Sequence, residues 1–315
     1  MADRLCHVLP AAADRAGLSS GPAAMAPVPG SDAQDFGLDA GESVPIRPLS
    51  FRELLDLPFA VIQADIKKLA ALGLAGLVLA EDIVVAITVA GSAATQGSDA
   101  GTAWSAILST AVTGWLLRLF LRGVTVPIGL AGVRGRPMTW RGALRQLGRR
   151  LGPLLGDRLF YTLQGIAVPA MGLLVVFAGI LGAIPLLGWL RARRLCLVPA
   201  LFEEQATYRG AVGRAKILAA GAEWRLAGLW LAQRVLFLVM AVPLLGVPLF
   251  ISDFSGTHRW AVIVLATSGV LLIAAFTEVV DAATSVVGYV DRRCRREAMD
   301  VRIPDPAKRI PGTIR

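Results

Sequence analysis

Charge and the residues of acid–base chemistry are scarce in this sequence. Only 17% of its 315 residues are charged, and it has two histidines, His7 and His258. Histidine is the side chain that most often transfers protons near neutral pH, so candidates for such chemistry are few. The three cysteines, Cys6, Cys196 and Cys294, form no Cys-x-x-Cys or Cys/His pattern. We therefore expect no disulfide framework, no metal site, no cofactor and no catalytic residue.

Apolar residues are abundant instead. Hydrophobic side chains make up 55% of the chain, and a chain with so little charge beside them is typical of a polytopic membrane protein. The net charge of +9 could indicate nucleic-acid binding. However, the basic residues lie beside apolar segments, where they act as topology determinants. We therefore expect membrane lipids with anionic headgroups as partners, and no nucleic acid.

A short motif of a hydroxyl residue, an aromatic residue and an arginine occurs three times. Each copy is followed, 18 or 19 positions after its hydroxyl, by a basic residue and then by a long apolar run. Such a repeat indicates three related units. The three copies are Ser50-Phe51-Arg52, Thr139-Trp140-Arg141 and Thr207-Tyr208-Arg209, and the basic residues are Lys68, Arg158 and Arg225.

The hydroxyl of each motif is suited to the N-cap of a helix, because its oxygen can accept a backbone N–H that the first turn leaves unpaired. Only the first copy has a full capping box, with Glu53 three residues after Ser50. Eighteen helical residues extend about 27 Å. Each motif therefore predicts an amphipathic helix that lies on a membrane surface before the chain enters the bilayer.

The apolar runs predict about six transmembrane helices. The run from 159 to 190 is too long for one straight span and short for two, so we expect its second half to be short or re-entrant. Six spans place the basic loops and the basic C-terminal segment on one side, whereas five would put some of them outside. The expected spans are 69–90, 104–121, 159–182, 183–202, 226–250 and 260–276.

The predicted fold class is an all-α integral membrane protein with three transmembrane hairpins, each preceded by a cytoplasmic amphipathic helix. Residues 1–47 lack an apolar signal-peptide segment and are rich in Ala, Pro, Gly and Asp, so we expect a disordered cytoplasmic tail. Residues 48–302 form the membrane domain, and residues 303–315 a disordered basic tail. Nine arginines and one acid between positions 118 and 158 place that loop, and with it both termini, in the cytoplasm.

Several segments resemble the bacterial membrane-domain family named after glycerophosphoryl diester phosphodiesterase membrane domains. The resemblance covers residues 48 to about 302. It implies a stand-alone six-helix bundle of the cytoplasmic membrane, near lipid or envelope metabolism, without the soluble phosphodiesterase domain. The segments are Pro48-Leu49-Ser50-Phe51-Arg52-Glu53-Leu54-Leu55-Asp56, Val198-Pro199-Ala200-Leu201-Phe202-Glu203-Glu204, Glu223-Trp224-Arg225-Leu226-Ala227-Gly228 and Tyr289-Val290-Asp291-Arg292-Arg293.

Three ionisable residues fall inside expected spans, where a charge costs about 2.5–3.5 kcal/mol on insertion scales. Glu81 and Asp82 lie in the middle of the first span, and Arg234 lies about 14 Å along the fifth. One hypothesis is a midplane polar site that binds a lipid headgroup or relays a proton. The alternative is a structural buried pair between Glu81 and Arg234, or a helix that turns its acids toward a water-filled crevice.

Exposed arginines of the amphipathic helices are candidate lipid-headgroup contacts, because a guanidinium binds phosphate oxygens through two parallel hydrogen bonds. The alternative is that each arginine only fixes its helix at the surface or pairs with a nearby acid. The candidates are Arg52, Arg141, Arg145, Arg149 and Arg209.

These observations support a non-catalytic membrane protein, serving as a scaffold that binds lipid, a protein partner or a second copy of itself. The alternative is a transporter or lipid flippase component that uses Glu81, Asp82 and Arg234. An intramembrane enzyme is a third reading, since Glu278 and Asp281 form a carboxylate pair, but no histidine or serine elbow accompanies them. We expect Glu278 and Asp281 to meet arginines of the basic helices instead.

Overall fold

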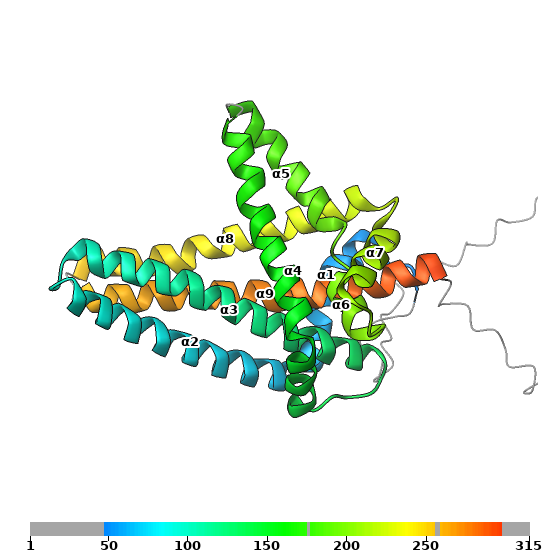
Figure 1. Cartoon of the computed structure of the whole chain (residues 1–315), viewed down its shortest axis with the longest axis horizontal. Helices are drawn as coiled ribbons and strands as arrows, with labels where there is room; N and C mark the ends of the chain where they lie inside the picture. The colour runs from blue at the N-terminus through cyan, green and yellow to red at the C-terminus, as the bar shows by residue number, and fades with distance from the viewer. Residues whose placement is uncertain (1–46, 175–176, 256–258, 298–315) are drawn as a thin grey trace, which may run out of the picture. The chain divides into compact units, whose positions relative to one another are not determined.

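The computed structural model describes residues 47–174, 177–255 and 259–297, all within one compact unit, Asp39–Arg315. Every regular element in these residues is an α-helix (Figure 1). The helices are α1 (Phe51–Ala64), α2 (Ile66–Ala94), α3 (Asp99–Val133), α4 (Trp140–Leu174), α5 (Phe177–Ala192), α6 (Leu197–Glu203), α7 (Tyr208–Ala219), α8 (Glu223–Ser255) and α9 (Arg259–Glu297).

The three hydroxyl residues of the repeated motif are N-caps, as the sequence predicted. Ser50 caps α1 and forms the full capping box with Glu53. Thr207 accepts the N–H of Gly210 at the start of α7. Thr139 accepts the N–H of Gly142 at 3.2 Å, directly before α4. Each cap satisfies a donor that the first helical turn leaves free.

The expected break between surface helix and apolar segment is present in two of the three units. The chain breaks at Asp65 between α1 and α2, and Gly221 supplies a positive φ of 75° between α7 and α8. In the second unit the prediction of a break at Arg158 is wrong. There α4 is one continuous helix, although the Gly152-Pro153 dipeptide, a common turn signal, lies inside it.

Four of the described helices are long and apolar enough to cross a membrane, namely α2, α3, α8 up to Gly246, and α9 from Trp260. The all-helical class expected from the sequence is therefore confirmed for the described residues, and the four helices are compatible with a multi-pass membrane protein. The expected third and fourth spans coincide with α4, α5 and α6, which are not among these four. The four-helix set α2, α3, α8 and α9 is called the bundle below.

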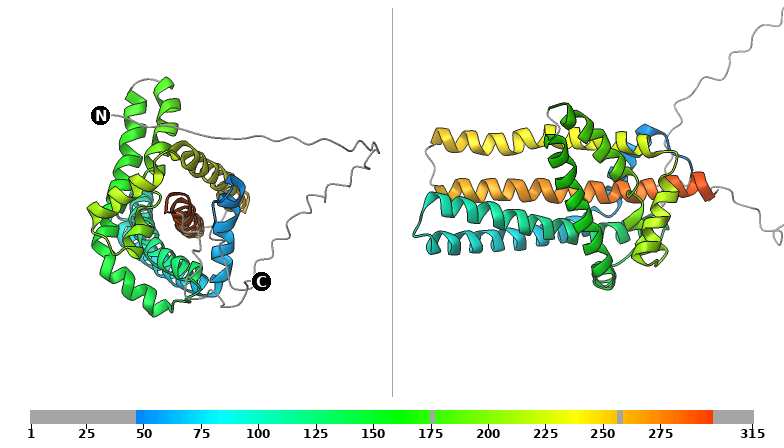
Figure 2. Two further views of the ribbon diagram at one scale, coloured as in Figure 1. Left: turned by 90° about the vertical axis from the view of Figure 1, so that its right-hand side faces the viewer. Right: turned by 45° about the horizontal axis from the view of Figure 1, so that its top comes forward.

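The bundle helices lie side by side along most of their length (Figures 1 and 2). Helices α2 and α3 approach closely where small residues meet, at Gly91 and Ser105, as in many membrane helix pairs. Hydroxyl groups connect the same two helices, since Thr102 donates to Ser92 at 3.0 Å. Outward faces of the bundle carry large exposed apolar residues, for example Leu79 and Leu238. Such faces suit hydrocarbon rather than water.

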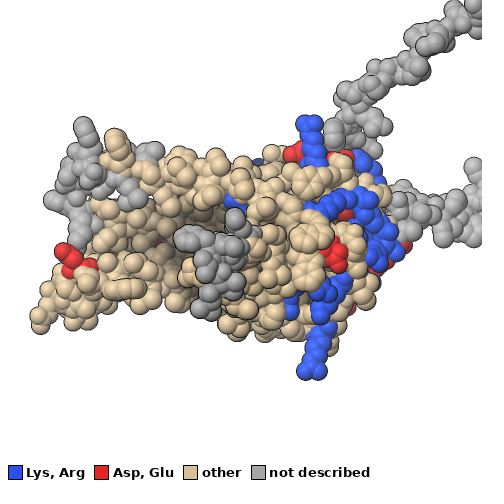
Figure 3. Space-filling view, turned by 90° about the horizontal axis from the view of Figure 1, so that it is seen from above, with Lys and Arg blue, Asp and Glu red and all other residues tan. Residues whose placement is uncertain are grey.

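Helices α1, α6 and α7 pack around the final turns of α3 and α9, at one end of the bundle. Their core includes the fully buried side chains of Leu54, Leu197, Leu201 and Leu218, with Tyr289 from α9. Lys and Arg side chains gather over this end on the face shown in Figure 3. We call it the basic end.

The α4–α5 hairpin crosses the bundle at a steep angle (Figures 1 and 2). Trp115 on α3 donates its indole N–H to the Thr162 hydroxyl of α4 at 2.9 Å. Gly188 of α5 faces Ala227 and Trp230 of α8, where a Cβ would lie 3.5 Å from side-chain atoms of both residues. The hairpin is therefore attached at its base to both sides of the bundle.

The predicted membrane domain, residues 48–302, contains all of these helices. The predicted tails, residues 1–47 and 303–315, lie outside the described residues apart from Arg47.

Candidate functional site

A fully buried carboxylate, Glu278 of α9, joins three helices near the basic end. Its side chain has no exposed surface, and it accepts from three arginines. Arg118 Nε lies 2.7 Å from Glu278 Oε2, Arg122 Nη1 lies 3.3 Å from Oε1, and Arg158 Nη1 lies 3.2 Å from Oε2. Because Arg158 belongs to α4, the expected meeting of Glu278 with an arginine of the basic helices is confirmed.

One turn further along α9, Asp281 forms a second set of ion pairs. Its partners are Arg234 of α8 and, at 3.9 Å, Arg118 of α3. Next to it, Gln233 donates to the hydroxyl of Thr284. Arginines on α3 and α8 are thus held by carboxylates that all project from α9.

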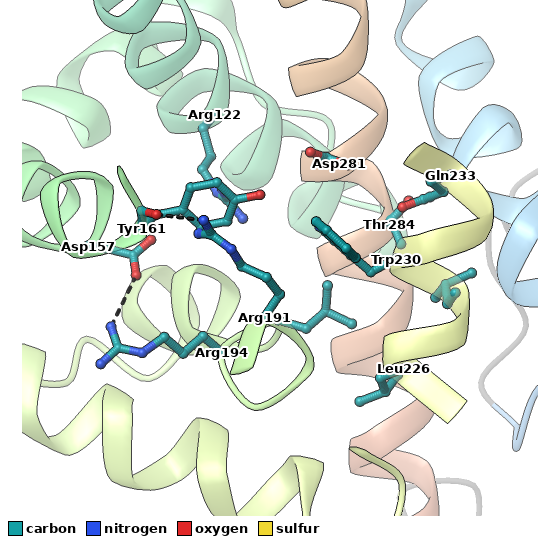
Figure 4. A pocket seen from close by; sticks show the side chains of 12 residues that line it. Arg122, Asp157, Tyr161, Arg191, Arg194, Leu226, Trp230, Gln233, Asp281 and Thr284 are labelled. Atoms are coloured by element: carbon teal, nitrogen blue, oxygen red, sulfur yellow. Dashed lines mark hydrogen bonds and ion pairs between the residues drawn. The ribbon is translucent and has the colours of Figure 1, made fainter. Parts of the chain in front are cut away.

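The base of the α4–α5 hairpin supplies a third carboxylate and two more arginines. Arg194 lies 3.8 Å from Asp157. Arg191 donates to the backbone carbonyl of Tyr161 at 2.5 Å, and its guanidinium stacks on the Tyr161 ring (Figure 4). Arg191 is only 7% exposed. Among the described residues, however, no carboxylate lies within ion-pair distance of it.

These groups surround a small cavity of about 30 Å³ (Figure 4). A water molecule needs roughly 10–15 Å³ on this measure, so the cavity has room for about two waters or one small ion. Its lining comes from α3, α4, α5, α8 and α9. The lining residues are Arg122, Asp157, Tyr161, Arg191, Arg194, Leu195, Leu226, Leu229, Trp230, Gln233, Asp281 and Thr284.

The groups in and around the cavity carry more positive than negative charge. We call them the charged cluster: Arg118, Arg122, Arg158, Arg191, Arg194 and Arg234, with Asp157, Glu278 and Asp281. Six guanidinium groups face three carboxylates, which leaves three positive charges without a compensating acid in the cluster.

Asp157 adds to this imbalance. Burial raises the pKa of the Asp157 carboxyl above its ordinary value, while Arg122 and Arg194 act in the opposite direction. Burial has the larger effect because a low-dielectric surrounding disfavours the charged carboxylate. Any protonation of Asp157 leaves the cluster still more positive.

Buried polar atoms without a partner in the described residues are concentrated here. Arg122 Nε, Arg158 Nε, Arg191 Nε and Nη1, and Trp230 Nε1 all lack a hydrogen bond. Every one of them is an N–H donor. In most proteins such groups are paired, so an unpaired set in one place indicates an absent acceptor.

The structure separates the residues of the expected midplane site. Glu81 accepts from Thr267 of α9 at 2.7 Å, whereas Arg234 pairs with Asp281. Asp82 is exposed on the outer face of α2. Among the described residues, Glu81 and Arg234 therefore have different partners, and Arg234 belongs to the charged cluster.

The five arginines expected to contact lipid headgroups are all exposed. Arg52 pairs with Asp56 at 3.7 Å on the surface of α1, and the Arg141 guanidinium stacks on the neighbouring Trp140 ring. Arg145 and Arg149 follow on α4, and Arg209 lies in the first turn of α7. None of the five belongs to the charged cluster.

Sequence reasoning did not identify Arg158, Arg191, Tyr161 and Trp230 as site residues. The available signal was the position of Arg158 and Arg191 at the two ends of an apolar run, where burial of an arginine is costly unless it has a partner. Pairwise distances between helices were needed to find the rest.

No group of three or more His, Cys, Asp or Glu side chains in the described part of the chain is arranged to hold a metal ion. The chain matches no protein-family model, no curated protein and no solved structure. The resemblance stated from the sequence therefore stays a prediction, and the function is argued from the geometry alone.

Proposed function

We propose that this chain is a non-catalytic integral membrane protein that binds anionic lipid at its basic end. The observation that carries the proposal is the charged cluster, which has surplus guanidinium groups and closes one end of an apolar four-helix bundle. An uncompensated buried charge is costly, so a site of this kind is stabilised by an anion. Phospholipid headgroups are the most abundant anions at that place in a membrane.

The depth of the cluster supports this proposal. Arg118 lies about 28 Å along α3 from Asp99, and Glu278 lies about 28 Å along α9 from Arg259. The hydrocarbon core of a bilayer is about 30 Å thick. If the far ends of α3 and α9 meet one membrane surface, the cluster lies at the headgroup level of the other.

The proposed location is the bacterial cytoplasmic membrane, with both termini in the cytoplasm. Four and six crossings both place the termini on the same side, and the excess of arginine at the basic end favours the cytoplasmic side. The six-span arrangement in three hairpins requires α4 and α5 to cross fully. Their steep angle to the bundle instead favours four crossings, with α4–α5 as a re-entrant or surface hairpin (Figure 2).

Lipid analysis of the purified protein tests the proposal. The protein is extracted from its membrane in mild detergent, and retained phospholipids are quantified by mass spectrometry against the lipids of the starting membrane. Enrichment of anionic over zwitterionic lipid is expected, and its absence would refute the function. A matched variant with Arg141, Arg145 and Arg149 changed to Gln separates lipid held by exposed arginines, which it loses, from lipid held by the cluster, which it keeps.

A second candidate function is a transporter or flippase component. It is favoured by one observation: Glu81 lies in the apolar part of α2, with Oε1 bound by Thr267 and the buried Oε2 without a partner in the described residues. Intramembrane carboxyls of this kind are often functional. Flux through proteoliposomes that is abolished by Glu81→Gln would support transport, and equal flux with and without the protein would exclude it.

A protein partner or a second copy of the chain is a further proposed ligand of the scaffold. Crosslinking in intact membranes before extraction, followed by identification of the linked species, tests for both. If reagents that react with the exposed lysine and arginine side chains link the chain to no other molecule, that result would argue against both a protein partner and a second copy.

A further inference from the structure

We infer that the cavity beside Arg191 is a binding site for a single phosphate group, supplied by a lipid headgroup or by free phosphate. The inference deepens the lipid-binding proposal and, for the lipid form of the ligand, rests on it. It adds a defined pocket, a ligand class and the residues that hold the ligand.

Arg191 is the central residue of this site. Its guanidinium is buried between α4, α5 and α8, and its single hydrogen bond among the described residues goes to the carbonyl of Tyr161. Nε and Nη1 remain without a partner. Arginine stays protonated in proteins, so these N–H groups are charged donors on two sides of the guanidinium. Stacking on the Tyr161 ring holds the guanidinium in place.

The opposite walls contribute further free donors. Trp230 Nε1 on α8 has no acceptor, and neither has Arg122 Nε on α3. Both residues line the same cavity as Arg191 (Figure 4). An indole N–H can only donate. Residues with unpartnered donor groups from three helices therefore line one small space.

The carboxylates in the lining are already engaged. Asp157 pairs with Arg194, and Asp281 pairs with Arg234 and Arg118. The unpartnered buried atoms of the lining are four N–H groups and no oxygen atom. The chemical complement of such a lining is a ligand that only accepts and carries negative charge. Water is a poorer complement, because each molecule also needs acceptors for its own hydrogens.

The size and geometry of the cavity restrict the ligand to a single oxyanion. A cavity of about 30 Å³ excludes a whole headgroup, but it admits the terminal oxygens of a phosphate whose ester bond points outward. Hydrogen bonds from a guanidinium to phosphate oxygens are charge-assisted and about twice as strong as neutral ones. A phosphate monoester, with its higher charge, offsets the three surplus positive charges better than a diester.

Two substitutions test the site with little change of volume. Arg191→Lys keeps the charge and removes the guanidinium donors, and Trp230→Phe removes only the indole N–H from an aromatic side chain. The matched control is Trp224→Phe, since Trp224 lies on the same helix, is 68% exposed and does not line the cavity. Each protein is purified free of phospholipid, and its baseline melting temperature is recorded to confirm that it is folded.

Binding is measured as the rise in melting temperature during titration with inorganic phosphate, short-chain phosphatidic acid or short-chain phosphatidylcholine. Wild type and Trp224→Phe should respond to phosphatidic acid, or to phosphate, at concentrations about tenfold lower than Arg191→Lys and Trp230→Phe, because a lost charge-assisted bond costs on the order of a factor of ten. Phosphatidylcholine should have little effect. A response to both anions indicates a phosphate pocket open to either source, and a response to phosphatidic acid alone indicates a lipid site.

Equal responses in all four proteins, or no response in wild type, would overturn the inference. Anionic lipid that copurifies equally with wild type and Arg191→Lys would also overturn it, yet would leave the proposed lipid-binding function intact. Conversely, loss of all copurifying lipid together with an Arg191-dependent response to inorganic phosphate would refute lipid binding and keep the phosphate site.

Discussion

Arg158 Nη1 donates a hydrogen bond to Glu278 Oε2 at 3.2 Å, although the two residues are 120 positions apart in the chain. The bond joins α4 to α9, and Glu278 also forms ion pairs with Arg118 and Arg122 of α3. One carboxylate thus holds three guanidinium groups that would otherwise repel each other. The position of the α4–α5 hairpin on the bundle depends on this arrangement.

Replacing Glu278 by Gln should therefore be strongly destabilising. Removing one partner of a buried ion pair leaves its charge uncompensated, which costs about 3–5 kcal/mol of unfolding free energy. Chemical unfolding in detergent, followed by tryptophan fluorescence, measures the loss.

Asp56→Asn is the control for Glu278→Gln. Asp56 pairs with Arg52 at 3.7 Å, but both side chains are mostly exposed, and pairs of this kind contribute about 0–1 kcal/mol. Similar small losses for both variants would show that the Glu278 pairs contribute little to stability.

The N-cap of α1 should contribute measurably to stability. Ser50→Ala removes the acceptor for the Glu53 N–H, and loss of such a cap costs about 1 kcal/mol. Ser50→Thr keeps the hydroxyl and should lose far less. Thermal melts of wild type, Ser50→Ala and Ser50→Thr in the same detergent measure these losses. Indistinguishable melting temperatures would contradict a stabilising cap.

The capping box predicts a pH dependence. The hydrogen bond from the Ser50 backbone N–H, assisted by Arg47, lowers the pKa of Glu53 below its ordinary value of 4.5. The unfolded chain therefore binds the proton more readily than the folded one. The stabilisation is complete above pH about 4.5 and is lost as the pH falls through the lower, folded-state pKa.

Glu53→Gln isolates that contribution. The difference in melting temperature between wild type and Glu53→Gln should shrink as the pH is lowered from 6 to about 3, because protonation makes Glu53 neutral like Gln. A difference that stays constant over this range would show that the charge of Glu53 does not support α1.

The close contact of α2 and α3 should not tolerate a methyl group at Gly91. A Cβ there would lie 2.5 Å from Ser105 Cβ, which moves only with its backbone. We expect Gly91→Ala to cost about 1–3 kcal/mol. Gly148→Ala in α4 meets open space and should be neutral or stabilising, since Ala is the better helix former by about 1 kcal/mol. Unfolding of both variants in one detergent tests the contrast.

Thiol labelling can determine how many times the chain crosses the membrane. Gly182 lies at the junction of the expected spans 159–182 and 183–202 and is exposed on α5, and native Cys196 and Cys294 are buried. In a background with Cys6 replaced by Ser, a cysteine at position 182 should resist an impermeant reagent added from outside, because a hairpin that crosses the bundle keeps this position in the membrane. A cysteine at Ser98, in the α2–α3 turn, is the accessible control.

Rapid external labelling at position 182, comparable to that at position 98, would instead show that α4 crosses fully and would restore the six-span topology. Labelling of neither position from outside, with labelling of both after permeabilisation, would reverse the proposed orientation.

Local features of the chain were predictable because neighbouring residues decide them. Ser50, Thr139 and Thr207 cap helices through contacts with residues three positions away, so spacing was enough to find them. The pairing of Glu278 with an arginine of a basic helix also followed from depth and charge. The partner of Arg234 could not be predicted in this way. Two acids at similar depths on different helices are equally suitable partners until the rotation of each helix is known.

The sequence by itself determined an all-helical class with long apolar helices and the concentration of basic residues near the ends of apolar runs, since hydropathy, capping and charge are local properties. Only the tertiary structure decided that Arg122, Arg191 and Trp230, from three different helices, line one cavity and carry unpartnered N–H groups. Helix rotation and crossing angle set that convergence, and both arise from side-chain packing between segments far apart in the chain.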